Sequence, residues 1–297
     1  MIEILELYKS FGEVQALNGL NMKVGRGSVY GLVGPNGSGK TTCMKHISGT
    51  YKADSGQVLM NGEEVYENTM QKSRTAFISD EIYAFPTAST LDMMKFYKGI
   101  YKSFDEERFN KLSESFDIDP KQLVRKLSKG KKKQVAFWLA LSLRPELLVL
   151  DEPFDGLDPL MRREVWSLLM DDVAENGTTV ISSSHNLREL EDVCDHVGII
   201  SRGKMLVERN LSDLQENIAK VQLVLSEGSA LPKSLNILNE SRQGRMQVLI
   251  VRGKREKIEE ELKALNPVFL DALPLSLEEI FIYEVKGEEL KHESLNI

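Results

Sequence analysis

The chain has 297 residues, enough for one large domain and a smaller one, and its 41% apolar content can build a hydrophobic core. Acidic residues (45) outnumber basic ones (38), and the resulting net charge of −7 argues against nucleic acid as the main partner. The longest apolar stretches, 135–143 and 147–150, are far shorter than the roughly 18 residues that a membrane-spanning helix needs. Any role at a membrane would therefore require a partner subunit.

Nothing in the first eight residues suggests a secretion signal, because they include two acidic side chains and no suitable apolar run. The two cysteines, Cys43 and Cys194, are far apart and have no metal-ligand spacing. We therefore expect a reduced, cytoplasmic protein. Cys43 falls just inside a predicted helix, whose positive end would favour a thiolate, but a packed, unreactive thiol is the preferred interpretation.

The amino-terminal segment 2–66 consists of short apolar runs broken by glycines, a pattern typical of hairpin strands. One apolar strand, 29–33, is followed directly by a predicted helix. This helix should begin at Gly39 or Lys40 and continue to Ser48. An antiparallel β subdomain is expected around it.

A helical insert follows, at about 82–145, because apolar residues recur at helical spacing over 90–125. The strand 147–150, the helix 159–176 and the strand 179–182 then alternate along the chain. Alternation of this kind is typical of parallel βα units, so we predict a doubly wound α/β core.

The character of the sequence changes after about Leu211, so we divide the chain into a first domain at 1–211 and a small α/β domain at 212–297. The second domain should contain two strands separated by a polar stretch, then two helices: 221–225, 246–251, 254–265 and 276–283. The last residues, 287–297, are expected to form a loose tail.

A phosphate-binding P-loop pattern is matched residue for residue between the strand 29–33 and the next helix: Gly34, Pro35, Asn36, Gly37, Ser38, Gly39, Lys40, Thr41 and Thr42. Its glycines allow backbone N–H groups to surround phosphates at a helix start. Lys40 would neutralise the β and γ oxygens, and Thr41 would ligate Mg²⁺. An ordinary glycine-rich turn is the alternative, and the glycine order differs from the dinucleotide-binding fingerprint.

Two adjacent carboxylates, Asp151 and Glu152, end the strand 147–150. Alternation along a strand would send them to opposite sides, so that one faces Mg²⁺ and the other an attacking water. Pro153 should keep Glu152 in the extended region. The alternative is a carboxylate pair that caps the next helix.

Two weaker patterns complete the set. Small residues, Ser128 and Gly130, and a run of lysines open a helix predicted over 131–143, where an anion would be favoured, although a solvated helix entrance is the usual meaning of such a run. His185 follows the strand 179–182, and ligands of open α/β sheets gather at that edge. The other histidines receive a structural interpretation: His46, His196 and His292.

The order of these motifs over 2–210 resembles the ATP-binding subunit of ABC transporters, a P-loop NTPase fold. The resemblance implies that Phe11 stacks on adenine, with Tyr8 as a weaker candidate. It further implies that Asp151 supports Mg²⁺, that Glu152 is the general base and that His185 contacts the γ-phosphate of ATP.

The resemblance also implies a dimer. Ser128 and Gly130 would be the signature loop that completes the ATP site of a second cassette, with Asp158 near the shared interface. The second cassette could be identical or a paralogue. A separate polytopic membrane subunit would place the dimer at the inner face of the cell membrane.

The sequence departs from the family pattern at two places. Asp80 stands where the family has glutamine after the strand 75–79, and this aspartate is a further candidate Mg²⁺ ligand. The signature reads Leu-Ser-Lys-Gly-Lys, and we hypothesise that Lys129 and Lys131 attract the ATP bound by the partner.

The end of the chain, with Leu-Glu-Glu-Ile-Phe at 277–281, looks like the extension of bacterial exporters of the antibiotic-resistance type, so we expect an exporter ATPase. An alternative is a soluble ABC-type ATPase acting on ribosomes or DNA, which the acidic balance disfavours. A GTPase is disfavoured because no Asn-Lys-x-Asp guanine-reading motif appears, and a kinase would not explain the signature together with His185. A scaffold that binds ATP without hydrolysis would not need Glu152.

Overall fold

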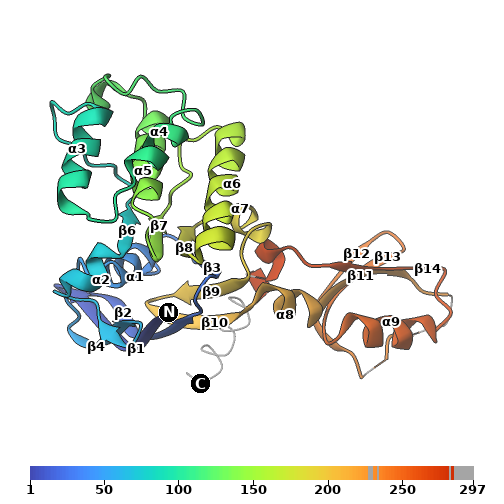
Figure 1. Ribbon diagram of the computed structural model, residues 1–297. Helices are drawn as coiled ribbons and strands as arrows, with labels where there is room; N and C mark the ends of the chain where they lie inside the picture. Colours follow the sequence, from blue (N-terminus) through green and yellow to red (C-terminus); the bar gives the residue numbers. More distant parts are fainter. Residues whose placement is uncertain (227–229, 233, 281, 284–297) are drawn as a thin grey trace. The chain divides into compact units, whose positions relative to one another are not determined.

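The computed structural model describes residues 1–226, 230–232, 234–280 and 282–283 (Figure 1). Its contacts divide the chain into two compact units. The first comprises Met1–Asn186 and His196–Glu208, and the second comprises Leu187–Asp195 and Arg209–Ile297. The predicted tail and Phe281 lie outside the described residues.

A four-stranded antiparallel sheet opens the first unit, in the order β2-β1-β4-β5. Its strands are β1 (Ile2–Phe11), β2 (Val14–Val24), β4 (Ser55–Met60) and β5 (Glu63–Glu64). Ile2 pairs with Val24 on one side and with Met60 on the other. The predicted antiparallel subdomain is therefore confirmed.

A six-stranded sheet forms the centre of the first unit, in the order β10-β9-β3-β8-β7-β6. In chain order its strands are β3 (Val29–Val33), β6 (Thr75–Ile78), β7 (Leu147–Asp151), β8 (Thr179–Ser184), β9 (His196–Ser201) and β10 (Lys204–Asn210). The neighbours from β9 to β6 run parallel. Every residue of β3, β7 and β8 is buried, as expected for parallel strands covered on both faces.

Helix α1 (Lys40–Ile47) connects the two sheets through a shared core. Its Met44 and Ile47 are buried with Leu7 and Leu20 of the antiparallel sheet and with Val149 of the parallel sheet. Two further helices of the first unit are α2 (Thr69–Ser73) and α6 (Pro159–Asn176). The boundaries of α6 are those predicted from the sequence.

The helical insert contains α3 (Thr90–Ile100), α4 (Glu106–Leu112), a 3₁₀ turn (Val124–Lys126) and α5 (Lys129–Ser142). Trp138 of α5 stacks on Phe109 of α4 with 4.5 Å between ring centroids, and its indole N–H donates to the Phe109 carbonyl oxygen at 2.7 Å. Arg108 of α4 pairs with the buried Asp172 of α6. Aromatic packing thus holds α4 and α5 together within the insert, and the ion pair joins the insert to α6.

The second unit has an antiparallel sheet in the order β12-β13-β11-β14. Its elements are α7 (Arg188–Glu191), α8 (Leu211–Glu216), β11 (Ile218–Val224), β12 (Asn236–Gln243), β13 (Met246–Arg252), α9 (Arg255–Lys263) and β14 (Phe269–Pro274). Ile258 and Leu262 of α9 are buried in the core of this unit with Val221 and Leu249 of the sheet.

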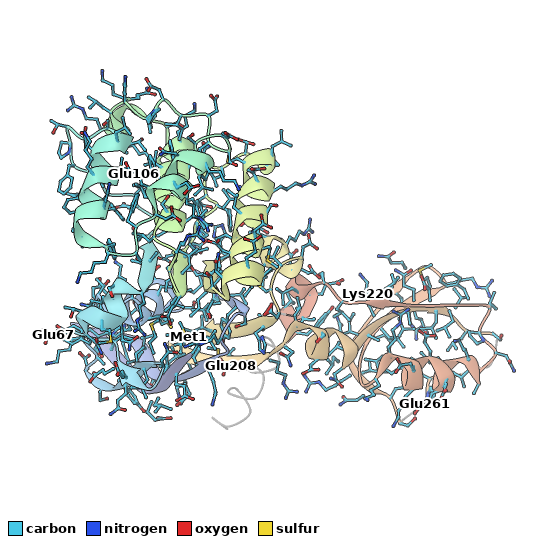
Figure 2. The ribbon with its side chains drawn as sticks, in the orientation of Figure 1. Met1, Glu67, Glu106, Glu208, Lys220 and Glu261 are labelled. Carbon is cyan, nitrogen blue, oxygen red and sulfur yellow. The ribbon has the colours of Figure 1, made fainter. Side chains whose placement is uncertain are left out.

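The segment between the two predicted strands is polar, as the sequence indicates, but it also contains β12 at 236–243, a strand that was not predicted. Most of its side chains are exposed, so the alternation that marks a half-buried strand is missing from its sequence. After β14, Ser276 and Glu279 form a capping box at the start of the helical residues 277–280, as the sequence suggested. Glu279 also pairs with Lys220, labelled in Figure 2, at 2.7 Å.

Among the described residues, no helix is both long and apolar enough to span a bilayer.

Candidate nucleotide-binding and catalytic site

The P-loop connects β3 to α1, and Lys40 is the first residue of the helix. Gly39 has a φ of 110°, and a Cβ at this position would lie 2.6 Å from the Ala16 carbonyl oxygen, so both conformation and space require glycine. Lys40 is 5% exposed, and its Nζ donates to the Gly34 carbonyl oxygen at 2.8 Å. The Ser38 hydroxyl is buried and lacks a hydrogen-bond partner among the described residues. These features suit a phosphate group.

A hydroxyl and a carboxylate meet where β7 ends. Asp151 is 1% exposed, and its Oδ1 accepts hydrogen bonds from Thr41 Oγ1 at 3.2 Å and from Ser183 Oγ at 2.8 Å. Hydroxyl and carboxylate oxygens are ligands that Mg²⁺ prefers, so this donor set fits the ion. Sequence reasoning missed Ser183, although three buried serines at the end of β8 are an unusual polar signal in a parallel strand.

Glu152 does not adopt the extended backbone predicted from the following proline. Its φ is 45°, in the left-handed region that non-glycine residues seldom occupy. Two hydrogen bonds hold its backbone: its N–H donates to Ser183 Oγ at 3.1 Å, and its carbonyl accepts from Lys133 Nζ at 2.6 Å. The side chains of Ser183 and Lys133, which are distant from Glu152 in the sequence, therefore hold this backbone conformation, and the local sequence pattern does not indicate it.

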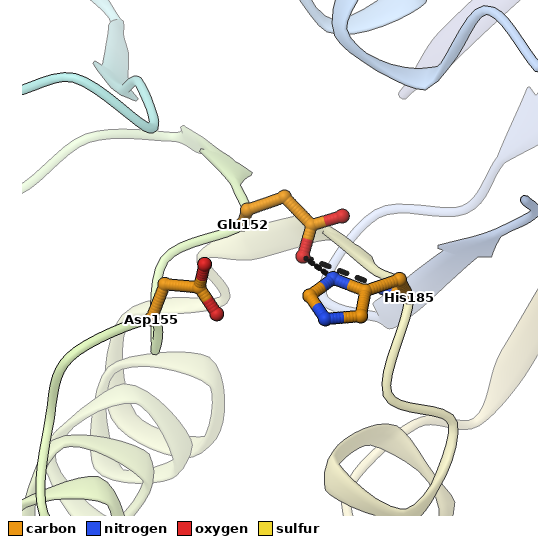
Figure 3. A group of neighbouring side chains, drawn as sticks. All are labelled: Glu152, Asp155 and His185. Atoms are coloured by element: carbon orange, nitrogen blue, oxygen red, sulfur yellow. Dashed lines mark hydrogen bonds and ion pairs between the residues drawn. The ribbon is translucent and has the colours of Figure 1, made fainter. Parts of the chain in front are cut away.

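The Glu152 carboxylate is directed toward His185 (Figure 3). Its Oε2 lies 2.8 Å from His185 Nδ1, and its Oε1 lies 3.7 Å from Lys40 Nζ. Asp151 instead contacts Thr41, so the two carboxylates do face different groups, as expected. Asp155, which the sequence reasoning did not select, offers a third ligand atom within 4.8 Å of those of Glu152 and His185.

The signature residues form local contacts of their own. Ser128 is the exposed N-cap of α5 and accepts from the Lys131 N–H at 3.3 Å. A Cβ on Gly130 would lie 2.3 Å from the Gly156 carbonyl oxygen, so the start of α5 touches the segment before Asp158. Asp158 is exposed and caps α6 through the N–H groups of Leu160 and Met161. In the described chain, no hydrogen bond or ion pair joins Ser128, Gly130 or Asp158 to the P-loop.

Asp80 lies beside lysines. Its Oδ1 is 3.3 Å from Lys133 Nζ and 3.6 Å from Lys129 Nζ, and Lys129 is also 3.7 Å from Asp155. Lys131 donates to the Asp117 carbonyl oxygen at 2.8 Å. Among the described contacts, none joins Asp80 to Thr41 or Asp151. Lys133, at the heart of this group, was not singled out from the sequence.

Phe11 ends β1 and is 45% exposed. The Phe11 ring contacts the Tyr51 ring edge to face, with 5.5 Å between the two centroids. Lys9 Nζ lies 5.5 Å from the centroid of the Phe11 ring. An exposed aromatic ring braced in this way is available to stack on a base.

Both cysteines and His46 are buried. Cys43 is fully buried, and burial raises the pKa of its thiol to about 12, so the packed, unreactive interpretation is supported. Burial likewise raises the pKa of Cys194. His46 is buried with its Nδ1 2.8 Å from the Thr42 carbonyl oxygen, and burial lowers its pKa. His292 lies outside the described residues.

A lysine-bearing loop at a helix start, a hydroxyl–carboxylate pair and a second carboxylate held by histidine define a nucleotide-hydrolysing P-loop domain. Residues 17–155 match the family model described as "ABC transporter". The ABC transporter ATP-binding protein YtrB of Bacillus subtilis is 30% identical over 289 residues, which cover 97% of this chain and 99% of that protein. The chain therefore belongs to the ATP-binding subunits of ABC transporters, and it is an ATPase.

Two further similarities agree with this assignment. The bacitracin transport ATP-binding protein BcrA of Bacillus licheniformis is 35% identical over 229 residues, which cover 74% of this chain and 73% of that protein. A solved ATP-binding subunit of an ABC transporter superposes with a TM-score of 0.68 at 26% identity, covering 72% of this chain and 92% of that one. The family and the fold predicted from the sequence are confirmed.

Proposed function

We propose that this chain is the motor subunit of a bacterial exporter. The chain dimerises with a second cassette around two ATP molecules, and the dimer drives a separate membrane subunit. The observation that carries the hydrolytic part is the Glu152 carboxylate, which is bound to His185 and lies next to Lys40. Similarity to the bacitracin transport subunit supports the transport role. The chain would act at the cytoplasmic face of the membrane.

Each site residue has a role in this proposal. The loop N–H groups and Lys40 bind the β and γ phosphates. To do so, Lys40 gives up its hydrogen bond to the Gly34 carbonyl oxygen. Glu152 accepts a proton from the attacking water, while His185 holds Glu152 Oε2 and contacts the γ-phosphate. Thr41 and Asp151 would hold Mg²⁺, which neutralises phosphate charge when bound. Phe11 would stack on adenine.

The exposed signature residues support dimerisation. Ser128 presents a capped helix start to solvent, and the neighbouring Asp158 and Leu160 are exposed as well, with Leu160 at 78%. In the proposed dimer, Ser128 and Gly130 reach the γ-phosphate bound by the other cassette, and Asp158 lies at the interface. The second cassette is either another copy of this chain or a paralogue.

An aromatic groove of the first unit supports a membrane partner. A cavity of about 420 Å³ is lined by β6, the segment that follows it, α3, α5 and residues that follow α1. Large apolar side chains beside it are exposed, among them Tyr83 at 81%, Phe85 at 42% and Phe96 at 44%. Apolar surface of this kind is typical of a contact with another protein.

The proposal is tested by affinity purification of the full chain from solubilised membranes. A polytopic membrane protein should co-purify and stimulate ATP hydrolysis. Recovery of ribosomes or DNA alone would instead favour the soluble ABC-type ATPase.

A further inference from the structure

Lys133 is a completely buried lysine in the second turn of α5, with 0% of its side chain exposed. Lysine is seldom buried without partners, because an ammonium loses its hydration there. Its Nζ lies 2.6 Å from the Glu152 carbonyl oxygen and 3.3 Å from Asp80 Oδ1. Lys133 thus differs from Lys129 in the same run, which is exposed.

The Glu152 carbonyl that Lys133 binds belongs to a residue with an unfavourable backbone conformation. A non-glycine residue at a φ of 45° persists only where its surroundings hold it, and a following proline disfavours helical conformations further. Ser183 and Lys133 hold the two sides of this residue, its N–H and its carbonyl. The direction of the Glu152 carboxylate depends on that backbone.

We propose that Lys133 is a positioning residue for ATP hydrolysis: its ammonium clamps the Glu152 carbonyl and so aims the carboxylate, and Asp80 is the counter-ion of this lysine and does not bind metal. The proposal rests on the assignment of Glu152 as the general base.

The charges around Lys133 agree with this role. Burial lowers the pKa of the Lys133 ammonium, and the Asp80 carboxylate acts in the opposite direction. Lys129 extends the group by pairing with both Asp80 and Asp155. The aspartate that replaces the family's glutamine therefore has a partner within this chain, namely a buried cation that requires a negative neighbour.

The first test is Lys133→Met in the purified full chain, with phosphate release as the assay. Because a misplacement of about 1 Å can cost up to roughly 100-fold in rate, we expect kcat to fall at least about tenfold. KM and the Kd for ATP should stay within about twofold of the parent, since the P-loop is untouched. Lys132→Met, a change at the neighbouring and less buried lysine, is the matched control and should leave kcat unchanged.

Two further variants separate positioning from charge balance. Asp80→Asn keeps the bond from Lys133 to Glu152, so it should hydrolyse ATP faster than Lys133→Met and show the parent's dependence on Mg²⁺. The double variant Lys133→Met/Asp80→Asn should remain as slow as Lys133→Met. If the double variant recovers the rate of Asp80→Asn, Lys133 only balances charge and the proposal is wrong.

Conservative changes keep the test valid if Lys133→Met folds poorly. Lys133→Arg retains a charged donor and should recover at least half of the parent kcat. In Lys133→Gln the neutral side chain can stay buried, so the melting temperature should remain that of the parent. Its amide is one bond too short to reach the Glu152 carbonyl, so ATP hydrolysis should stay slow. Parent activity in Lys133→Gln would overturn the proposal.

Glu152→Gln, assayed alongside, distinguishes the two levels of failure. If it abolishes hydrolysis while Lys133→Met retains the parent kcat, only the positioning role fails. If Glu152→Gln hydrolyses at the parent rate, the general base is wrongly assigned and the proposed function must be revised first.

Discussion

The Lys40 ammonium is the charge that our proposal assigns to the β and γ phosphates. It is nearly buried at the start of α1, bound to the Gly34 carbonyl oxygen at 2.8 Å and lying 3.7 Å from Glu152 Oε1. Carbonyl oxygens are weaker partners for a cation than phosphate oxygens, so an incoming nucleotide can replace them.

Lys40→Ala removes this charge and should raise the Kd for ATP at least about tenfold, which corresponds to about 1.4 kcal/mol. Isothermal titration of the purified chain measures this Kd. Lys204→Ala changes an exposed lysine of β10 and serves as the control. Undiminished affinity in Lys40→Ala would refute the role of this lysine.

Glu152→Gln keeps the size of the side chain and should preserve ATP binding. It should reduce hydrolysis by about 100-fold or more, because a carboxamide cannot accept the proton of the attacking water. Phosphate release at saturating ATP is the measurement, with the exposed Glu164→Gln of α6 as control. Hydrolysis at the parent rate would show that another group is the base.

At the scale of elements, the ion pair between α4 and α6 decides how firmly the helical insert is attached. Arg108 is 14% exposed and Asp172 is 3% exposed at their side chains, and Asn176 also donates to Asp172 at 3.0 Å. Burial raises the pKa of Asp172, and Arg108 opposes that change. Since such a pair is desolvated, removal of one partner leaves a buried charge.

Arg108→Met should therefore lower the free energy of unfolding of the first unit by about 3 kcal/mol. The nearby Arg144→Met breaks a more exposed pair with Asp105 and should cost about 1 kcal/mol or less. Thermal unfolding of the full chain compares the two. The double variant Arg108→Met/Asp172→Leu should regain most of the loss, and a failure to do so would contradict the charge explanation.

At the scale of the whole molecule, the site is incomplete without a partner in our proposal. Ser128 is exposed at the start of α5, and among the described contacts nothing connects it to the P-loop of the same chain. Its proposed target is the nucleotide of a second cassette. Dimer formation and ATP binding can therefore be separated by substitution.

In a Glu152→Gln background, ATP should cause a dimer to accumulate, as measured by size-exclusion chromatography with light scattering. Adding Ser128→Arg should remove the dimer while the Kd for ATP stays within about twofold, because the P-loop is unchanged. Ser113→Arg, at an exposed serine after α4, should leave the dimer intact. If Ser128→Arg still dimerises with ATP, the signature loop does not lie at the interface.

Much of the fold follows from local patterns. The all-buried strands β3 and β7 and the helices α1 and α6 have clear sequence signals, since apolar runs and capping residues act over a few positions. The exposed strand β12 has no such signal. Its pairing with β13 comes from backbone hydrogen bonds, which any polar sequence can make.

The site residues also fall into two groups, those that a local sequence pattern indicates and those that only the tertiary structure reveals. The P-loop, Asp151, Glu152 and His185 could be proposed from the sequence because each stands at or just beyond the carboxyl end of a strand. The left-handed backbone of Glu152, its hydrogen bond to Ser183 and the hydrogen bond that it accepts from Lys133 became visible only in the tertiary structure. Those bonds join residues 31 and 19 positions apart. The sequence by itself determined which chemical groups are present, whereas their mutual orientation was decided by contacts between elements that no local pattern records.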